Sequence, residues 1–198
     1  MAIVVDKVQK RRDIALACVE LFTQSGINDL SIAKVAKTAG VGKGTIYEYF
    51  KNKNDIVFEI LNILMNEHNE IKEKKLLNVD STKEKVKVFF SFFYNEEDVA
   101  LREMYKEFTS ILLTNPNDEM LEFQTECYNL YNNWIDRIID EGIKRGELFE
   151  HTKELIMGLF AFAQGMFLMS ATTNAVGDLQ KQINTQIDIL FELIEVKK

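Results

Sequence analysis

Proline and cysteine are scarce in this sequence. Pro116 is the single proline among 198 residues, and proline interrupts helices because it lacks a backbone N–H and clashes with the preceding turn. So few breakers indicate many uninterrupted helices. The cysteines, Cys18 and Cys127, lie far apart within helical patterns, whereas a disulfide framework uses more of them in an oxidising compartment. We interpret both as reduced core residues of a cytoplasmic protein.

Membrane and catalytic signals are also scarce. No apolar run reaches the roughly 18 residues that a membrane span needs, and the charges of the N-terminal MAIVVDKVQKRR follow its apolar run, unlike those of a secretory signal. His68 and His151 have no metal-ligand spacing around them. GVGKGT resembles half of a phosphate-binding loop but lacks its spacing and a preceding strand. We therefore expect neither an enzyme nor a membrane protein, and no metal or cofactor.

Basic residues are few overall but are concentrated near the N-terminus. The net charge of the chain is −7, which as an average argues against a nucleic-acid partner. Residues 1–53 hold nine Lys/Arg and five Asp/Glu, a net charge of +4, whereas residues 54–198 hold fifteen and twenty-six, a net charge of −11. A basic head on an acidic body would direct the head toward phosphates. Taken alone, chance clustering explains these charges equally well.

Apolar residues at helical spacing predict an all-α fold of about nine helices. The first helix is expected over residues 6–25 and a short pair within 31–53. Further helices are expected over 54–77, from 81, from 98, and over 116–144, 152–173 and 178–196. We find no convincing strand, internal repeat or low-complexity segment.

The stretch SIAKVAKTAGVGKGTIYEYFKNK, residues 31–53, predicts two short helices joined by a tight turn. Ser31 is a good N-cap, because its hydroxyl accepts from a free N–H of the first turn. Gly40 supplies the positive φ that ends a helix without steric strain. One apolar face at i, i+3, i+4 and i+7 spacing is formed by Ile32, Val35, Ala36 and Ala39.

The second helix of this pair, residues 43–49, has few apolar anchors. Ile46 and Phe50 lie one turn apart and leave the other tips exposed, namely Lys43, Gly44, Thr45, Tyr47, Glu48 and Tyr49. Such a helix adds little to a core but suits a surface that enters a DNA major groove. Near the N-terminus, Lys7, Lys10, Arg11 and Arg12 either lie beside a phosphate backbone or form a solvated basic turn.

These residues resemble the N-terminal domain of the TetR (tetracycline-repressor) family over about residues 8–60, most specifically in the run AGVGKGTIYEYFKNK. The resemblance implies a homodimeric transcription factor, usually a repressor, released from a palindromic DNA operator by a small molecule. It assigns residues 1–53 to a helix-turn-helix head and residues 54–198 to a helical body for effector binding and dimerisation. The alternative is a helical protein-interaction or ligand-binding module without specific DNA binding.

By the same resemblance, DNA contacts are expected at Ser31, Gly42, Lys43, Gly44, Thr45, Tyr47, Glu48, Tyr49 and Lys53. At 100° per residue, Gly44, Thr45 and Glu48 lie opposite the two anchors and face base edges, whereas the flanking tyrosines and Lys53 face phosphates. Lys43 donates to a guanine or to a phosphate.

Two positions in the head depart from the family pattern. Gly42 stands where a small hydroxyl residue is common, so a phosphate contact or a helix cap is missing there. Glu48 either accepts from a cytosine amino group or merely repels DNA, and we slightly favour a carboxylate that is solvated or locally paired.

Family resemblance also places the last two helices across a dimer axis. Small residues on the apolar helix over 152–173 permit close approach of another helix, and apolar residues form a stripe along the last helix. The expected interface consists of Gly158, Ala161, Gly165, Ile183, Ile187, Leu190 and Ile194. The alternative is that both helices fill the core of a monomer. We favour the dimer, because twofold pairs are the usual readers of paired half-sites.

The body is rich in aromatic residues, most of which we expect to be ordinary core. The resemblance implies an effector cavity among them, for a small apolar or aromatic ligand. Its candidate lining residues are Tyr105, Phe108, Tyr131, Trp134, Gln164 and Phe167.

Overall fold

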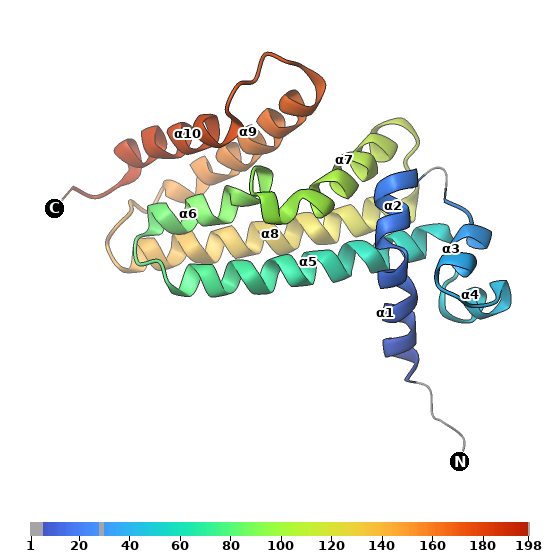
Figure 1. Cartoon of the computed structure of the whole chain (residues 1–198). Coiled ribbons are helices and arrows are strands. Elements are labelled where there is room, and N and C mark those ends of the chain that lie inside the picture. The colour runs from blue at the N-terminus through green and yellow to red at the C-terminus, as the bar shows by residue number, and fades with distance from the viewer. Residues whose placement is uncertain (1–5, 28–29, 198) are drawn as a thin grey trace. The chain divides into compact units, whose positions relative to one another are not determined.

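The computed structural model describes residues 6–27 and 30–197, which form an all-α fold, as predicted (Figure 1). Its α-helices are α1 (Lys7–Ala17), α2 (Val19–Ser25), α3 (Ile32–Thr38), α4 (Lys43–Tyr49), α5 (Lys53–Leu77), α6 (Thr82–Phe90), α7 (Val99–Thr114), α8 (Asp118–Lys144), α9 (Thr152–Thr172) and α10 (Leu179–Ile194). Two short 3-10 helices, η1 (Ser91–Phe93) and η2 (Glu96–Asp98), join α6 to α7. Within the described ranges the extended pairing is limited to one isolated antiparallel bridge, Leu148 with Glu195. Residues 1–5, part of the run that argued against a secretory signal, lie outside the described residues.

The first predicted helix is divided at Cys18, which accounts for the difference from nine expected helices. Cys18 has φ −99° and ψ −4°, and its N–H donates to the Ala15 carbonyl at 2.9 Å. Ile14, Cys18 and Phe22 are buried as predicted, but Ala15 is buried in place of Ala17. The break therefore preserves most of the predicted apolar face.

The chain divides into two compact units, one of residues 1–69 and 99–123 and one of residues 70–98 and 124–198. In the first unit α3 packs against α4 and α2 packs against α7. Its core comes from every helix of the head and from α5 and α7, including Ile14, Phe22, Val35, Ile46, Phe50, Ile56, Ile60 and Phe108. The predicted functional boundary after residue 53 stays a prediction.

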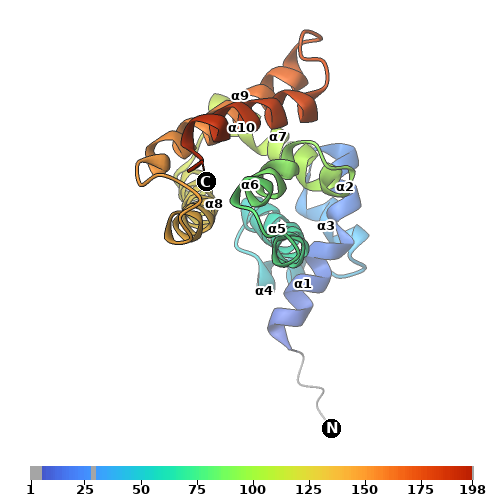
Figure 2. The ribbon, with the colours of Figure 1, turned by 90° about the vertical axis from the view of Figure 1, so that its left-hand side faces the viewer.

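An aromatic core fills the second unit. Phe89 of α6 meets the edges of Tyr131 and Trp134 of α8 at ring-centroid distances of 6.4 and 6.0 Å, and it lies 6.3 Å from Phe160 of α9. α10 packs against α9 and α6, and Figure 2 shows α9 and α10 running side by side. The residues after α10 pair with the α8–α9 connection, where the Val196 N–H donates to the Glu147 carbonyl at 2.9 Å.

α9 is long and apolar enough to cross a membrane by length and composition alone, and only 22% of its apolar window is buried. This differs from the expectation that no segment meets that test. The reason is that Gln164 and Ser170 interrupt strict apolarity without adding charge, so the segment from Leu155 to Gly177 has no charged residue. A helix that is apolar on most sides and largely uncovered needs a further surface against which to pack.

Candidate nucleic-acid interface

The head positions α3 and α4 through two local devices. The Ser31 hydroxyl accepts from the Lys34 N–H at 3.3 Å and caps α3, as predicted. Gly40 has φ +65°, and the Val41 N–H donates to the Ala36 carbonyl at 3.0 Å, which closes the last turn of α3. The chain then enters α4 through Gly42, whose extended conformation offers no side-chain cap.

α4 has the two predicted buried anchors, but two of its six residues predicted to be exposed are only partly exposed. Ile46 and Phe50 are buried, at 0% and 2% exposed. Tyr47 is 62% exposed, Lys43, Gly44 and Glu48 are also exposed, and Thr45 and Tyr49 are half-buried. The helix thus presents an arc of donors, acceptors and one aromatic ring to solvent, with a glycine that permits close approach. Whether each residue touches a base or a phosphate stays a prediction.

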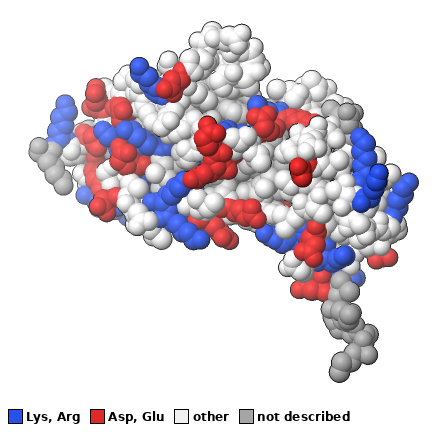
Figure 3. Space-filling view, in the orientation of Figure 1, with Lys and Arg blue, Asp and Glu red and all other residues white. Residues whose placement is uncertain are grey.

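Basic side chains surround this arc. Lys34 and Lys37 of α3 and Lys51 after α4 are exposed. Figure 3 shows Lys and Arg side chains gathered over the end of the head that carries α3. Positive charge beside an exposed reading helix is the electrostatic pattern of a phosphate-binding surface.

Lys53, predicted to contact phosphate, turns inward in this structure. Its amine donates to the Ile27 carbonyl at 2.9 Å, and the N–H of Ile27 donates to the Glu107 carboxylate. Ile27, which follows α2, is therefore held from α5 and from α7. Glu107 was not predicted from the sequence, because nothing in the local pattern of α7 indicates a partner 80 positions earlier.

Arg11, considered beside Lys7, Lys10 and Arg12 as a phosphate contact, also turns inward. Its guanidinium donates to Asp55 and Glu59 of α5, each at 2.7 Å, and to the Tyr49 carbonyl at 2.5 Å. Burial alone would lower the pKa of Arg11, but its bonds to Asp55 and Glu59 raise it above the ordinary value. Burial raises the pKa of Asp55, yet the bonds from Arg11 and the Lys51 N–H outweigh that effect and lower it.

Residues 14–60, which contain this head, match the family described as "Bacterial regulatory proteins, tetR family". The "Fatty acid metabolism regulator protein" of Bacillus subtilis is 32% identical over 148 residues, which cover 73% of each chain. The chain belongs to the TetR family.

Solved structures agree with this assignment. A TetR-family regulator from Cytophaga hutchinsonii, 18% identical, superposes with a TM-score of 0.81 over 99% of this chain and 100% of that one, which shows a shared fold. The regulator FadR of Bacillus subtilis in complex with stearoyl-CoA is 27% identical, with a TM-score of 0.63 over 90% of this chain and 96% of that one. The present protein is accordingly a DNA-binding transcriptional regulator.

Predicted effector residues of this TetR-family protein fall into two groups. Tyr105 and Phe108 belong to the first unit, where Phe108 packs against Phe58 and Phe123. Tyr131, Trp134, Gln164 and Phe167 belong to the second. There, Tyr131 and Trp134 stack at 6.3 Å between centroids, and Phe167 lies 5.6 Å from Phe93. Phe108, Trp134 and Phe167 are buried, so these side chains form core in the present conformation.

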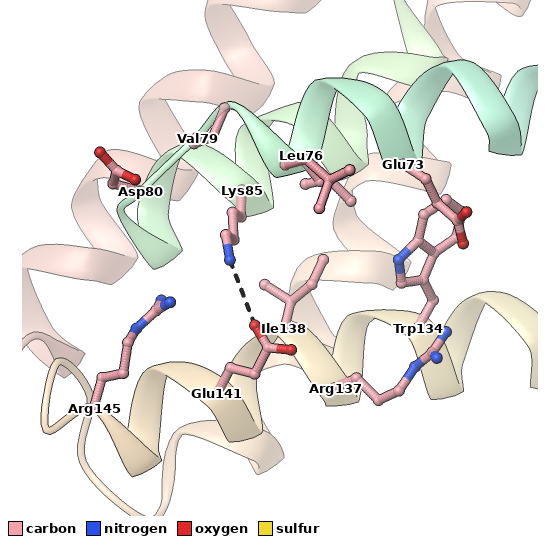
Figure 4. Close-up of a pocket in the computed structure, with 11 residues that line it drawn as sticks. Glu73, Leu76, Val79, Asp80, Lys85, Trp134, Arg137, Ile138, Glu141 and Arg145 are labelled. Atoms are coloured by element: carbon pink, nitrogen blue, oxygen red, sulfur yellow. Dashed lines mark hydrogen bonds and ion pairs between the residues drawn. The ribbon is translucent and has the colours of Figure 1, made fainter.

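The second unit also contains an open cleft of about 440 Å³ (Figure 4). Of the predicted effector residues only Trp134 lines it; the remaining lining residues are Glu73, Leu76, Leu77, Val79, Asp80, Lys85, Arg137, Ile138, Glu141 and Arg145. Lys85 of α6 and Glu141 of α8 point toward one another across it, with 3.4 Å between amine and carboxylate. The cleft is thus lined by six charged and five apolar residues, unlike the aromatic-lined cavity that the sequence suggested.

Lys72 lies beneath the aromatic core of this unit and is only 3% exposed. Its amine donates to the Phe89 carbonyl at 2.7 Å and lies 5.1 Å from the Phe89 ring centroid and 5.8 Å from that of Trp134. Burial lowers the pKa of Lys72 to about 7, with Asp98 raising it and Lys75 lowering it further. A lysine among the apolar residues of a helix gives no sign in the sequence that its side chain is buried.

Proposed function

We propose that this protein is a repressor that binds a palindromic operator as a homodimer and is released by a fatty-acyl thioester. The observation that carries the DNA-binding part is the exposed arc of α4, whose buried anchors are Ile46 and Phe50. In this proposal the head, residues 1–53, reads DNA, and residues 54–198 dimerise and bind the effector in the cytoplasm.

Each predicted contact residue has a role in this proposal. Gly44, Thr45 and Glu48 face base edges, Lys43 donates to a guanine or a phosphate, and Tyr47 and Tyr49 reach phosphates on either side. At the helix starts, the backbone around Ser31 and Gly42 approaches phosphate. Lys53 contributes to phosphate binding only if its amine leaves the Ile27 carbonyl.

The proposed dimer uses the uncovered faces of α9 and α10. On α9, Gly158 and Ala161 are exposed, and a Cβ added at Gly158 or Gly165 would meet no atom within 4 Å. Leu155, Met157 and Met169 of α9 are about half exposed, at 48%, 50% and 50%. Two such faces related by a twofold axis would cover the apolar surface that a monomer leaves in water.

The α10 side of this interface differs from the sequence prediction. Ile183 and Ile187 are fully buried and Ile194 is 4% exposed, because they pack within their own unit. Leu190 is half-buried. Ile189 and Leu193 are 48% and 72% exposed, so the proposed contact moves to these two residues.

Similarity to the B. subtilis regulator that binds stearoyl-CoA supports a fatty-acyl thioester as the effector. Such a ligand has an apolar chain, which suits the aromatic core around Phe89, Tyr131 and Trp134, and an anionic end, which suits charged side chains such as those of the cleft. Binding would shift α5, which runs continuously from the head into the second unit, and so change the separation of the two heads. Adjacent major grooves lie roughly 34–36 Å apart, so a small change in separation is expected to weaken binding.

The operator is unknown, so the test begins with selection of duplexes by the full chain from a random DNA pool. An enriched palindrome, released by stearoyl-CoA but not by coenzyme A alone, would support the proposal. Enrichment of no sequence would contradict the DNA-reading part. Enrichment without release would contradict the effector part only.

A further inference from the structure

We propose that Arg11 is a positioning residue for the DNA-reading helix: with Asp55 and Glu59 it clamps the C-terminal end of α4 to α5. This inference rests on the proposed reading of DNA by α4. It assigns a role in operator affinity to three charged residues that do not themselves face the DNA.

The clamp joins three helices through one guanidinium. Arg11 of α1 donates through Nε to Glu59 Oε2 and through Nη2 to Asp55 Oδ1, each at 2.7 Å, and through Nη1 to the Tyr49 carbonyl at 2.5 Å. Its guanidinium carbon lies 4.5 Å from the centroid of the Phe50 ring, one of the anchors of α4. The planar, fork-like arrangement of arginine donors fixes these partners relative to one another.

α4 needs such a support because it is short. It has seven residues, fewer than the roughly 12–15 that an isolated helix needs for marginal stability. The Tyr49 carbonyl belongs to the last turn, where carbonyls have no partner within the helix. Arg11 satisfies that carbonyl, and Asp55 also accepts from the Lys51 N–H at 2.9 Å in the turn after α4. The end of the reading helix and the turn after it are thus tied to the same charged group.

Two acidic residues are unexpected directly beside a basic DNA-binding head, because each carboxylate repels phosphate. Asp55 and Glu59 are each 23% exposed as side chains and are both paired to Arg11. By charge alone, neutralising either one should strengthen DNA binding. If they hold α4 in place through Arg11, neutralising either one should weaken DNA binding. The two explanations therefore predict changes in DNA affinity of opposite sign.

The test measures operator affinity of Glu59→Gln, Asp55→Asn and Arg11→Gln full-length chains over a series of salt concentrations. Arg12→Gln and Glu67→Gln are matched controls, because Arg12 and Glu67 form a more exposed pair at 3.3 Å that does not reach α4. We expect each clamp variant to bind the selected operator at least about tenfold more weakly, and Glu67→Gln to bind as well as or better than the unchanged chain. Since Arg11 makes no phosphate contact in this proposal, Arg11→Gln should keep the salt slope of the unchanged chain, whereas loss of a phosphate contact lowers that slope by about 1.

Amide hydrogen exchange without DNA gives a second readout. The Phe50 N–H, which donates to the Ile46 carbonyl at 2.9 Å, should exchange faster in Arg11→Gln and Glu59→Gln, while core amides of the second unit keep their rates and show that the chain is folded. Unchanged or tighter operator binding by Glu59→Gln would overturn the inference, as would a reduced salt slope for Arg11→Gln. Failure of the unchanged chain to bind any duplex would instead overturn the proposed function, and the exchange rates would still test the clamp.

Discussion

Glu107 on α7 accepts a hydrogen bond from the backbone N–H of Ile27, at the end of the turn that follows α2. Lys53 donates to the carbonyl of the same residue at 2.9 Å. Gly26, just before, has φ +74°, and a Cβ there would lie 2.6 Å from a Glu107 carboxylate oxygen. Ile27 is therefore held by two charged side chains, those of Glu107 and Lys53, and the absence of a side chain at Gly26 leaves room for the Glu107 carboxylate.

Gly26→Ala should destabilise the protein more than Gly40→Ala. Both glycines have positive φ, but Gly26 also has ψ 163°, a conformation essentially restricted to glycine, and nothing lies within 4 Å of a Cβ added at Gly40. The difference in unfolding free energy between the two variants therefore combines the Glu107 contact with the backbone strain at Gly26. Denaturant unfolding provides both values, and in a Glu107→Ala background the difference should become smaller. An equally large difference in that background would contradict the close contact.

Gly42→Ser should stabilise α4 and strengthen operator binding. Gly42 is the N-cap of α4, its φ of −72° suits any residue, and no side chain caps the helix there. A serine hydroxyl would add the missing cap, worth a few tenths of a kcal/mol over glycine, and would restore the hydroxyl common in the family. Thermal unfolding and operator titration check this prediction, with Ser81→Ala as a control cap outside the head, since Ser81 caps α6 through the Glu84 N–H. Weaker DNA binding by Gly42→Ser would indicate that the groove needs a glycine at this position.

Lys72 should make stability rise with pH just above neutrality. Burial lowers the pKa of Lys72 to about 7, against about 10.4 in the unfolded chain, so above pH 7 the unfolded chain binds more protons and unfolding becomes less favourable. The free energy of unfolding should rise by up to about 1 kcal/mol per pH unit. This rise should be clearest below about pH 8.5. Burial raises the pKa of Cys18 and Cys127 to about 11, so at higher pH these thiols lose protons in the unfolded chain first and lower the stability.

Denaturant unfolding of Lys72→Met between pH 7 and about 8.5 checks this prediction, because the substitution removes the titrating group. We expect the free energy of unfolding to depend less on pH in this variant, whether the substitution raises or lowers the stability itself. Lys74→Met is the matched control on the same helix, since Lys74 is exposed. An unchanged slope in Lys72→Met would show that the buried amine does not titrate in this range.

Leu193→Glu should convert the proposed dimer to monomers. Leu193 is 72% exposed on α10, and a carboxylate placed twice across a twofold apolar contact should raise the dimer dissociation constant at least about tenfold, or about 1.4 kcal/mol. Sedimentation at several concentrations measures it. Leu113→Glu is a control, since Leu113 is 77% exposed but lies on α7. Equal dimerisation by both variants would exclude the proposed faces.

Much of the structure of the head could be predicted from the local sequence. Ser31, Gly40, Ile46 and Phe50 act within a few residues of themselves, so capping, turn and periodicity rules predicted their places. The break at Cys18 was missed because the same apolar periodicity continues on both sides of it.

Long-range partners could not be predicted in this way. Lys53 was predicted to contact phosphate, and Arg11 either to lie beside phosphate or to be solvated, because a basic side chain gives no local sign of where its charge is satisfied. Their partners lie up to 48 positions away. In α10 the apolar stripe correctly marked a buried face, but periodicity does not tell whether that face packs in its own chain or against a second copy. The charged cleft was missed because its lining comes from several separate segments.

The most direct measurement is a fluorescence anisotropy titration of the full chain against its selected palindrome and against a shuffled duplex of equal length. Reading of bases by α4 predicts binding to the palindrome about 10³-fold or more tighter than to the shuffled duplex at the same salt concentration. Equal affinity for the two duplexes would contradict sequence reading by the head.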